Sequence, residues 1–470
     1  MDAIDMNTSA VQALHAFWQL GSGDPDALGR VSFTGTDTQL PSVFQVGPLA
    51  AASIAAQALA AAEIWAMRSG RRQDIQVSMR KALAMFRSER YLTVDGQPPS
   101  EIRSPLTGYF QAGDGRWIQL HTNFPHHRAG VLKVLQCEDS YESVSAAIRR
   151  WKAADLDALL AQQGMCAALI RSPDEWQAHP QSAAIAGLPL FEIIRIGDAP
   201  VERVSRLEAS RPLSGVRVLD LSRVIAAPVA GRTLAQHGAD VLAISAAHLP
   251  NIAPLVIDTG RGKRSAQLDL RTAPGKDRLL ELIQGADVFL QAYRPGALAE
   301  LGFSPEDLCK RRPGLIQVSL SAYSHVGPWA TRRGFDSLVQ SATGIAYEEG
   351  ASAGLAEPGK LPCQALDHAT GYLAAFATMM ALKRRAEEGG SWLVRVSLAQ
   401  TGHWLQSQTR LAAQPAGTEL SREEIGACLQ VQDSPFGRVR AIGPVEQMSL
   451  TPPAFALPPV PLGTHEALWS

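Results

Sequence analysis

The chain is predicted to be an α/β protein, with a doubly wound parallel sheet and a smaller α+β domain. Two observations predict this fold. From Pro212 onward, short apolar strands alternate with helices at the spacing of parallel β–α units. Before that point, a β-hairpin pattern followed by helices indicates a separate α+β unit. With 470 residues, the chain is also too long for a single hydrophobic core, which favours several domains.

The N-terminal part predicts an amphipathic helix over 9–20, an Ala-rich helix over 48–68, a strand over 74–79 and a helix over 79–91. The Ala-rich helix has almost no polar face, so we expect it to be buried on most sides.

The small α+β unit starts with the segment TGYFQAGDGRWIQLHT, which predicts a hairpin that turns at Gly113-Asp114-Gly115. Its predicted elements are strands 109–111 and 116–121, helices 126–135, 143–152 and 156–163, strand 166–170 and a helix from Pro173. A polar, turn-rich stretch over 197–212 is typical of a linker.

The doubly wound sheet is predicted from strands 216–221, 241–244, 265–269, 288–291 and 315–320, with helices 229–237, 276–284 and 305–311 between them. A long Ala-rich helix after Asp367 and a strand over 392–396 follow. We divide the chain into residues 1–103, the small domain 104–199, a linker 200–211, the α/β domain 212–410 and a C-terminal segment 411–470 with a Pro-rich tail that we expect to lie extended.

An internal duplication is predicted from a gapless match of residues 45–79 with residues 364–398, over about 35 positions. Both copies have a glycine after the helix and a Val-Ser pair in the strand. Pro48 stands in the first copy where Asp367 stands in the second, so only the second copy carries a carboxylate at this position.

Composition excludes several classes of function. Hydrophobic residues make up 46% and charged residues 19% of the chain, which is typical of a well-buried globular protein. The net charge of −1 does not favour a nucleic-acid or membrane-surface partner. The N-terminus does not have the pattern of a signal peptide, and we expect no membrane-spanning run.

The cysteines also indicate the compartment. Five of them are scattered without a CxxC pair, so a disulfide framework or a zinc site is not expected and a cytoplasmic protein is favoured. They are Cys137, Cys166, Cys309, Cys363 and Cys428.

Asp367 stands where a loop meets a long buried helix. Taken alone, this pattern favours a helix N-cap, because an aspartate there satisfies free backbone N–H groups. The alternative is a nucleophilic carboxylate, kept ionised by the same N–H groups and the helix dipole. Asp336 is a second acid that could cap the helix running to Ala342, and we assign no role to His325 or to His368.

Other candidate residues follow the strands, where a doubly wound sheet binds its ligand. The turn after the first strand is Ser222-Arg223-Val224-Ile225-Ala226-Ala227-Pro228, whose small residues would let a ligand approach the backbone; it lacks the GxGxxG dinucleotide motif. Lys263 and Arg264 lie in a cationic turn that suits a phosphate, although such a turn is more often only solvated. Arg294 could bind phosphate while Tyr293 stacks on a base, or the two could simply form a Pro-Gly turn.

The segment from 212 to 398 resembles the class III coenzyme A transferases, a family that includes formyl-CoA and carnitine CoA-transferases and alpha-methylacyl-CoA racemase. The motifs that carry the resemblance are PLSGVRVLDLS, HGADV, GKRSAQLDL, GADVFLQAYRPGALAELGF, GPW and GFDSLVQSATG, in the order of the family.

The resemblance implies that Asp367 is the catalytic nucleophile, which forms a mixed anhydride with an acyl group and then a thioester with CoA. It implies that the turn Arg223, Val224, Ile225 and Ala226 contacts the CoA chain. Lys263 and Arg264 would bind its phosphates, and Tyr293 and Arg294 its nucleotide end. No bound cofactor is implied, because CoA and acyl-CoA are substrates, and family members form interlocked homodimers.

This chain departs from the family in several places. Phe335 stands where the racemase branch has a histidine, which disfavours α-proton exchange. Ser245 replaces the acidic end of the second strand, and the loop before GKRS is shorter. The hairpin region resembles the small domain of the family but precedes residue 212, and 434–445 and 458–466 resemble its closing segment. No glycine-rich lid is recognisable.

The sequence therefore predicts an acyl-CoA:carboxylate CoA-transferase. An acyl-CoA racemase or isomerase of the same superfamily and a CoA-binding scaffold without activity are the alternatives. The expected partners are an acyl-CoA and a carboxylic acid, with the chain as a homodimer.

Overall fold

A seven-stranded sheet forms the centre of the computed structural model, which describes residues 5–35, 40–99, 103–203, 210–412 and 420–469. Its strand order is β10-β9-β8-β11-β12-β13-β7. Six strands are parallel, and β7 pairs antiparallel with β13 at the edge. The strands are β7 (Phe191–Gly197), β8 (Arg217–Leu221), β9 (Asp240–Ser245), β10 (Lys263–Gln267), β11 (Val288–Gln291), β12 (Ile316–Ser321) and β13 (Ser391–Ser397).

The order of the parallel strands is that of doubly wound folds, in which the chain winds outward in both directions from the first strand. The first strand is β8, and its neighbour β11 begins the second half, so the switch point lies between these two strands. Loops after the carboxyl ends of β8 and β11 therefore flank a crevice that is the usual ligand site of such sheets.

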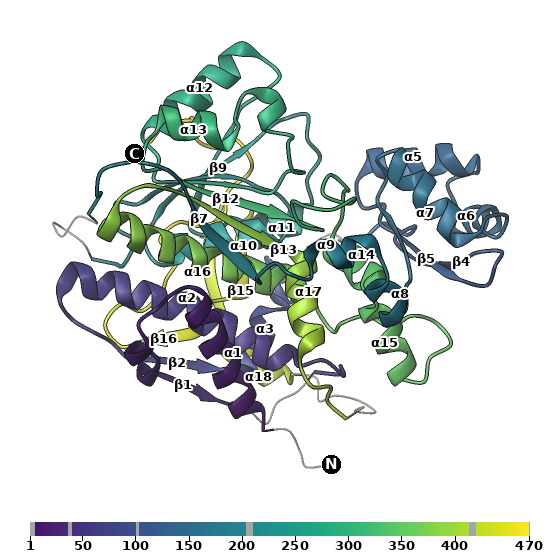
Figure 1. The fold of residues 1–470 in the computed structure, drawn as a ribbon, viewed down its shortest axis with the longest axis horizontal. Coiled ribbons are helices and arrows are strands. Elements are labelled where there is room, and N and C mark those ends of the chain that lie inside the picture. The colour runs from purple at the N-terminus through teal and green to yellow at the C-terminus, as the bar shows by residue number, and fades with distance from the viewer. Residues whose placement is uncertain (1–4, 36–39, 100–102, 204–209, 413–419, 470) are drawn as a thin grey trace.

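Helices cover both faces of this sheet (Figure 1). Helices α12 (Ala273–Gln284) and α13 (Pro305–Arg311) lie over one face, where they share a core with β8, β9 and β11. Helices α10 (Ala226–Gln236) and α16 (Ala365–Glu388) lie on the other face, inside the largest hydrophobic core. The short helix α11 (Ala253–Gly260) precedes β10 and was not predicted.

A further layer, built by both ends of the chain, packs beneath α16 (Figure 1). It contains α1 (Met6–Leu20), η1 (Pro25–Arg30), β1 (Val31–Thr34), α2 (Val46–Ser69), β2 (Ile75–Ser78), α3 (Met79–Met85), α4 (Ser88–Tyr91), β3 (Thr93–Val94), α18 (Arg422–Cys428), β14 (Leu429–Ser434), β15 (Gly437–Ile442) and β16 (Glu446–Met448). Two three-stranded sheets, β1-β2-β16 and β14-β15-β3, join the two ends of the chain. By length and composition, α2 could cross a membrane, but 89% of its most apolar window is buried, so it is a core helix here.

The small α+β unit has its own core and lies to one side (Figure 1). Its elements are β4 (Gly108–Gln111), β5 (Trp117–Leu120), α5 (Pro125–Leu135), α6 (Tyr141–Ile148), α7 (Ala153–Gln162) and β6 (Ala167–Leu169). Connecting helices α8 (Pro173–Gln177), α9 (Pro180–Ile185), α14 (Asp336–Ala342), α15 (Ile345–Ser352) and α17 (Leu398–Ser407), with the short η2 (Ala299–Leu301), complete the described elements.

The fold class is thus as predicted, with local corrections. A linker was expected to start at residue 197, but Gly197 is the last residue of β7, a strand that was not predicted. Residues 204–209 of that linker lie outside the described ranges. The helix expected over 79–91 is two helices, α3 and α4. Lys263 and Arg264 lie within β10 rather than in a turn before it.

Candidate active site

Asp367 lies in the first turn of α16 and is not the cap of that helix. The N-cap is Gln364, which makes no side-chain cap bond. Only 7% of Asp367 is exposed, yet it lines two cavities. The predicted cap is therefore wrong, and the position of the side chain instead fits a reactive group.

Two further acidic side chains, Asp336 and Glu89, lie near Asp367. The backbone N–H of Asp367 donates to Asp336 Oδ2 at 2.9 Å. Asp336 begins α14 without capping it, because Phe335 is the N-cap and the other carboxylate oxygen accepts from Gln340. Glu89 of α4 contacts His368 Nε2 at 3.2 Å. Neither Glu89 nor this role of Asp336 was predicted, because the contacts join distant segments.

The surroundings of Asp367 favour its protonated form. Burial raises the pKa of Asp367 well above its usual range, and the negative charges of Asp336 and Glu89 raise it further. Burial also raises the pKa of Asp336 to about 6. Burial thus opposes the expectation that helix N–H groups keep Asp367 ionised, and the N–H of Asp367 itself donates to Asp336.

The central cavity, of about 360 Å³, lies at the switch point of the sheet. The loops after β8 and β11 line it, together with Asp367 and residues from the small α+β unit. Val224 has a φ of 76°, in the left-handed region that β-branched residues rarely adopt. Such strain persists where surrounding structure enforces it, and it is typical of ligand sites.

Six of the eight residues predicted to bind CoA line this cavity. They are Arg223, Val224, Ile225, Ala226, Tyr293 and Arg294. The guanidinium of Arg223 lies 5.0 Å from the Phe124 ring centre and donates to the Pro250 carbonyl. Arg294 pairs with Glu300 at 3.0 Å near the surface.

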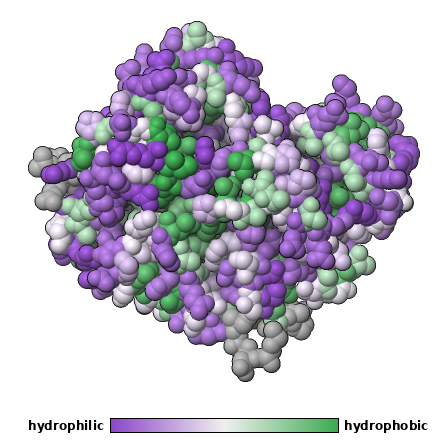
Figure 2. Space-filling view, in the orientation of Figure 1, coloured by the Kyte–Doolittle hydropathy of each residue, from purple (hydrophilic) through white to green (hydrophobic). Residues whose placement is uncertain are grey.

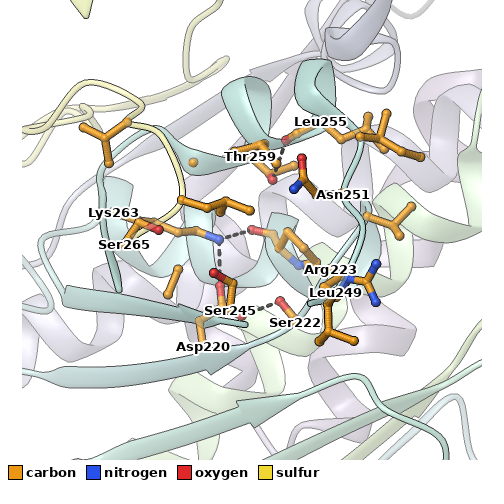
Figure 3. A pocket seen from close by; sticks show the side chains of 18 of the residues that line it. Asp220, Ser222, Arg223, Ser245, Leu249, Asn251, Leu255, Thr259, Lys263 and Ser265 are labelled. Atoms are coloured by element: carbon orange, nitrogen blue, oxygen red, sulfur yellow. Dashed lines mark hydrogen bonds and ion pairs between the residues drawn. The ribbon is translucent and has the colours of Figure 1, made fainter. Parts of the chain in front are cut away.

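Lys263 and Arg264 line a neighbouring cavity of about 80 Å³ beside β9 and β10, which shares Arg223 and Val224 with the central cavity. Lys263 Nζ donates to Asp220 Oδ2 at 2.7 Å and to the Pro228 carbonyl at 2.8 Å. Figure 3 shows this nitrogen pointing at Asp220 from within the lining. Arg264 pairs with Asp240 through two nitrogens, at 2.9 and 3.1 Å. A CoA phosphate would meet cations that already have carboxylate partners.

The lateral cavity, of about 820 Å³, has Asp367 in its lining as well. Segments near α4, the β4–β5 hairpin and the loop before α16 line it. His121 belongs to this lining and stacks on Phe335, with ring centres 3.8 Å apart. His126 and His127 line the central cavity instead. The sequence signal for these residues is the histidine-rich string HTNFPHH over 121–127.

The doubly wound sheet places a buried carboxylate, Asp367, in the lining of two cavities near its switch point, where α/β proteins bind their ligands. Comparison with known proteins gives the family. The model of CoA-transferase family III matches residues 26–189 and 213–441, and the chain belongs to this family.

Several curated relatives are similar to parts of the chain. An acyl-CoA transferase of Gibberella moniliformis is 31% identical over 64% of this chain and 57% of its own length. A probable fatty acyl-CoA transferase of Mycobacterium tuberculosis is 34% identical over 48% of this chain and 63% of its own. A succinyl-CoA–L-malate CoA-transferase alpha subunit of Chloroflexus aurantiacus is 28% identical over 49% and 56%. The chain thus spans somewhat more than half the length of these relatives.

Solved structures give similar matches. A hypothetical protein of M. tuberculosis is 35% identical, over 42% of this chain and 57% of that one, with a TM-score of 0.38. A CAIB/BAIF family protein of Brucella suis is 26% identical, over 49% and 65%, with a TM-score of 0.38.

Proposed function

We propose that the protein is an acyl-CoA:carboxylate CoA-transferase with Asp367 as its nucleophile. One observation carries the proposal. Among the described residues, Asp367 is the one acidic side chain that lines both the central and the lateral cavity. A carboxylate in that place can meet a thioester whose CoA lies on one side and whose acyl group lies on the other.

The reaction proceeds in balanced steps. The Asp367 carboxylate attacks the thioester carbonyl, and CoA leaves as its thiolate, which gives a mixed anhydride. The thiolate attacks the aspartyl carbonyl and releases the first acid, leaving an aspartyl-CoA thioester. A second carboxylate attacks this thioester and again frees the thiolate. Attack of the thiolate on the new acyl carbonyl yields the product acyl-CoA and free Asp367.

The raised pKa of Asp367 fits this chemistry. A desolvated carboxylate beside two other acids is a stronger nucleophile once it is ionised than a solvated one, because nothing stabilises its charge. Acylation removes that charge from the buried site. The relief of repulsion with Asp336 and Glu89 therefore favours the covalent intermediate.

In this proposal CoA occupies the central cavity. The turn Arg223–Ala226 contacts its chain, and Tyr293 and Arg294 contact its nucleotide end, because these residues line the same cavity as Asp367. Lys263 and Arg264 remain candidates for the phosphates, although binding would have to compete with Asp220 and Asp240.

Replacement of Asp367 by asparagine tests the proposal. Transfer of labelled CoA between acids should fall by at least about 10⁴-fold, as on removal of other covalent nucleophiles. Binding of CoA, measured by calorimetry, should persist. The matched control is Asp198→Asn, which changes an exposed acid away from the cavities and should transfer CoA normally. A well-folded, active Asp367→Asn enzyme would refute the assignment, and CoA binding without transfer by the unmodified protein would indicate a scaffold.

One observation favours an isomerase or racemase as the second candidate. Phe335 stands where the racemase branch has a histidine. His121 stacks on the Phe335 ring and lines the lateral cavity together with Asp367, so an imidazole is still present there. Burial lowers the pKa of His121 to about 4, so it is a neutral base at pH 7. Deuterium uptake at the α-carbon of an acyl-CoA, lost in His121→Gln, would support this reaction over transfer.

We further propose that the protein is a homodimer, as the family resemblance implies, and that it is cytoplasmic, as the pattern of its cysteines indicates. All five cysteines are free thiols, in keeping with a reducing compartment. Light scattering measures the assembly directly. Because segments of one chain line both cavities, a monomer would contradict the dimer but not the transfer reaction.

A further inference from the structure

Two cations that line the small cavity beside β9 and β10 were expected to bind CoA phosphates, and both have acidic partners. Lys263 Nζ donates to Asp220 Oδ2 at 2.7 Å, and both side chains are buried (Figure 3). Arg264 pairs with Asp240 at 2.9 Å, and its Nη1 donates to the Leu468 carbonyl at 2.6 Å. A phosphate at either cation would lie beside a carboxylate, whose like charge repels it.

The C-terminal segment 460–468 covers the edge of the sheet at this cavity. β10 is the last strand on that side. The N–H of His465 donates to the Ser265 carbonyl at 2.7 Å, and the N–H of Ser265 donates to His465 Nδ1 at 3.2 Å. Val460 and Leu462 line the cavity. The space left is about 80 Å³, whereas pockets for small molecules usually measure about 300 Å³ or more, so a nucleotide is not enclosed here.

The end of β9 also lacks an acid for a ribose. In doubly wound folds that bind dinucleotides, an acid about 20 residues after the phosphate-binding turn holds a ribose hydroxyl. Ser245 ends β9 in this chain, and its own hydroxyl donates to the Ala266 carbonyl at 3.4 Å. Arg294, expected at the nucleotide end, is exposed and pairs with Glu300 at 3.0 Å. The groups expected to bind the nucleotide therefore already have partners within the chain.

The central cavity offers its cations differently. Arg223 and Arg333 line it and donate to backbone carbonyls, those of Pro250 and Gly164. Within the described ranges, neither guanidinium forms an ion pair with an acid. A phosphate in this cavity therefore meets positive charge that no carboxylate neutralises, and a guanidinium matches the geometry of a phosphate.

We infer that the enzyme recognises the phosphopantetheine arm of its thioester donor and that the nucleotide of CoA adds little to binding or to rate. This inference rests on the proposed transferase function and names the part of the donor that the site binds. Thioesters of phosphopantetheine, which lack the nucleotide, then serve as donors in place of acyl-CoA.

The chemical steps stay the same with the shorter thiol. The Asp367 carboxylate attacks the thioester carbonyl, the carbon–sulfur bond breaks, and phosphopantetheine leaves as its thiolate. The thiolate attacks the aspartyl carbonyl and releases the first acid. The acceptor carboxylate takes the thiol through the same two steps, so it ends as a phosphopantetheine thioester and Asp367 is free again.

The test compares acetyl, succinyl and octanoyl thioesters of CoA and of phosphopantetheine as donors to the matching isotope-labelled acid. For the acyl group that CoA donates fastest, kcat/KM with the two thiols should agree within about tenfold. One hydrogen bond between charged groups is worth about tenfold or more, so a recognised nucleotide would give a larger difference. A loss of more than about tenfold without the nucleotide would overturn the inference.

Arg264→Gln separates a structural role from phosphate binding. It should change kcat/KM for both thiols by the same factor, because Arg264 holds Asp240 and the C-terminal segment rather than the donor. The matched control is Arg271→Gln, an exposed arginine paired with its neighbour Asp269, which should leave both values unchanged. A rise in KM confined to the CoA thioester in Arg264→Gln would assign a CoA phosphate to this arginine and overturn the inference.

Calorimetry gives a second readout that does not depend on turnover. Phosphopantetheine should bind with a Kd within about tenfold of that of CoA. Adenosine bisphosphate, the nucleotide part of CoA alone, should not displace CoA, and displacement would overturn the inference. A failure of the underlying function looks different, because then no thioester, that of CoA included, transfers its thiol to an acid.

Discussion

At the residue scale, the central feature is a group of three acids in a low-dielectric setting. Asp367, Asp336 and Glu89 come from α16, α14 and α4. Burial raises the pKa of Asp367 and of Asp336, and the negative charges of Asp336 and Glu89 raise the pKa of Asp367 further. Among these, Asp336 is held by the N–H of Asp367 and by Gln340, so its charge sits at a fixed place beside the nucleophile.

This arrangement predicts the pH dependence of transfer. A raised pKa means that Asp367 stays protonated and inactive in acid, so kcat/KM should rise with pH. Asp336→Asn removes a like charge while keeping an oxygen for the Asp367 N–H, so the pKa of Asp367 falls. The rising limb of the pH–rate profile should therefore move to lower pH.

Glu349→Gln is the control for this experiment, since Glu349 is a buried acid that lines neither cavity and bonds Ser42. It should leave the rising limb in place. A limb that does not move in Asp336→Asn would show that the charge of Asp336 does not act on the reacting group.

The sequence points to Asp367 as the reactive acid, which stays a prediction, but it does not predict the protonation state of that side chain. A resemblance in motifs pointed to Asp367, whereas the local pattern favoured a cap. The pKa of Asp367 depends on burial and on the charges of Asp336 and Glu89, and Glu89 lies far from Asp367 in the chain. No periodicity reports such a contact, so Glu89 could be found only in the folded structure.

At the element scale, the two Ala-rich helices have the same length and similar N-terminal ends. Both α2 and α16 have 24 residues. Their N-caps, Gln45 and Gln364, have nearly the same backbone angles, with φ of −77° and ψ of 61° and 62°. Ser78 and Ser397 each cap the next helix with the hydroxyl. These matching boundaries support the duplication predicted from the sequence, and they leave Pro48 opposite Asp367.

The approach of α16 to α10 depends on Gly371. A Cβ at this position would lie 2.3 Å from the Ala226 carbonyl oxygen and 2.8 Å from Val229 Cβ. Gly371→Ala should therefore push the two helices apart and cost about 1–3 kcal/mol of unfolding free energy. Because Ala226 belongs to the proposed CoA turn, CoA affinity should fall as well.

Gly402→Ala in α17 is the matched control, because the nearest atoms to its added Cβ lie at 3.6 Å. It should be neutral or stabilise by about 0.5–1 kcal/mol, as expected for glycine replaced in a helix. Chemical denaturation measures both variants. Equal stability of the two would show that the close contact of α10 and α16 is not required.

Elements with strong patterns were predicted well, while weaker patterns, such as those of β7 and α11, were missed. Strand β11 and helix α13 have their predicted bounds, because apolar runs and a Ser-Pro start mark them clearly. Strand β7 is half-buried and carries Glu192 and Arg195, so it lacks the apolar run of a central strand. Helix α11 is only 8 residues long, too short for a clear helical period.

At the scale of the whole molecule, the site depends on segments that are far apart in the sequence. His368 and Glu89 are 279 residues apart. Figure 2 shows apolar residues gathered on the face that α16 and the central sheet share, with polar surface around them. The chain also closes on itself, as β16 near the C-terminus pairs with β2. The sequence analysis did not predict that α4, the β4–β5 hairpin and α16 line one cavity together with Asp367.

Buried acids should also shape the stability of the whole protein. Burial raises the pKa of Glu349 to about 7. The folded protein keeps this proton while the unfolded chain loses it near pH 4.5, so unfolding becomes easier as pH rises from about 4.5 to 7. Glu349→Gln removes this loss. Relative to the unmodified protein, its unfolding free energy should increase by up to about 3 kcal/mol over that range.

Denaturation of both proteins at pH 5 and at pH 8 measures the effect. If the unfolding free energies of the unmodified protein and of Glu349→Gln differ by the same amount at both pH values, Glu349 has the same pKa in the folded protein as in the unfolded chain.

The central claim is that Asp367 carries the transferred group covalently, and mass spectrometry tests it most directly. The protein is mixed with an acyl-CoA in the absence of an acceptor acid, quenched and digested. We predict that the peptide containing Asp367 gains the mass of CoA less water, and that the gain is absent in Asp367→Asn. An enzyme that transfers CoA rapidly while this peptide stays unmodified would contradict the account.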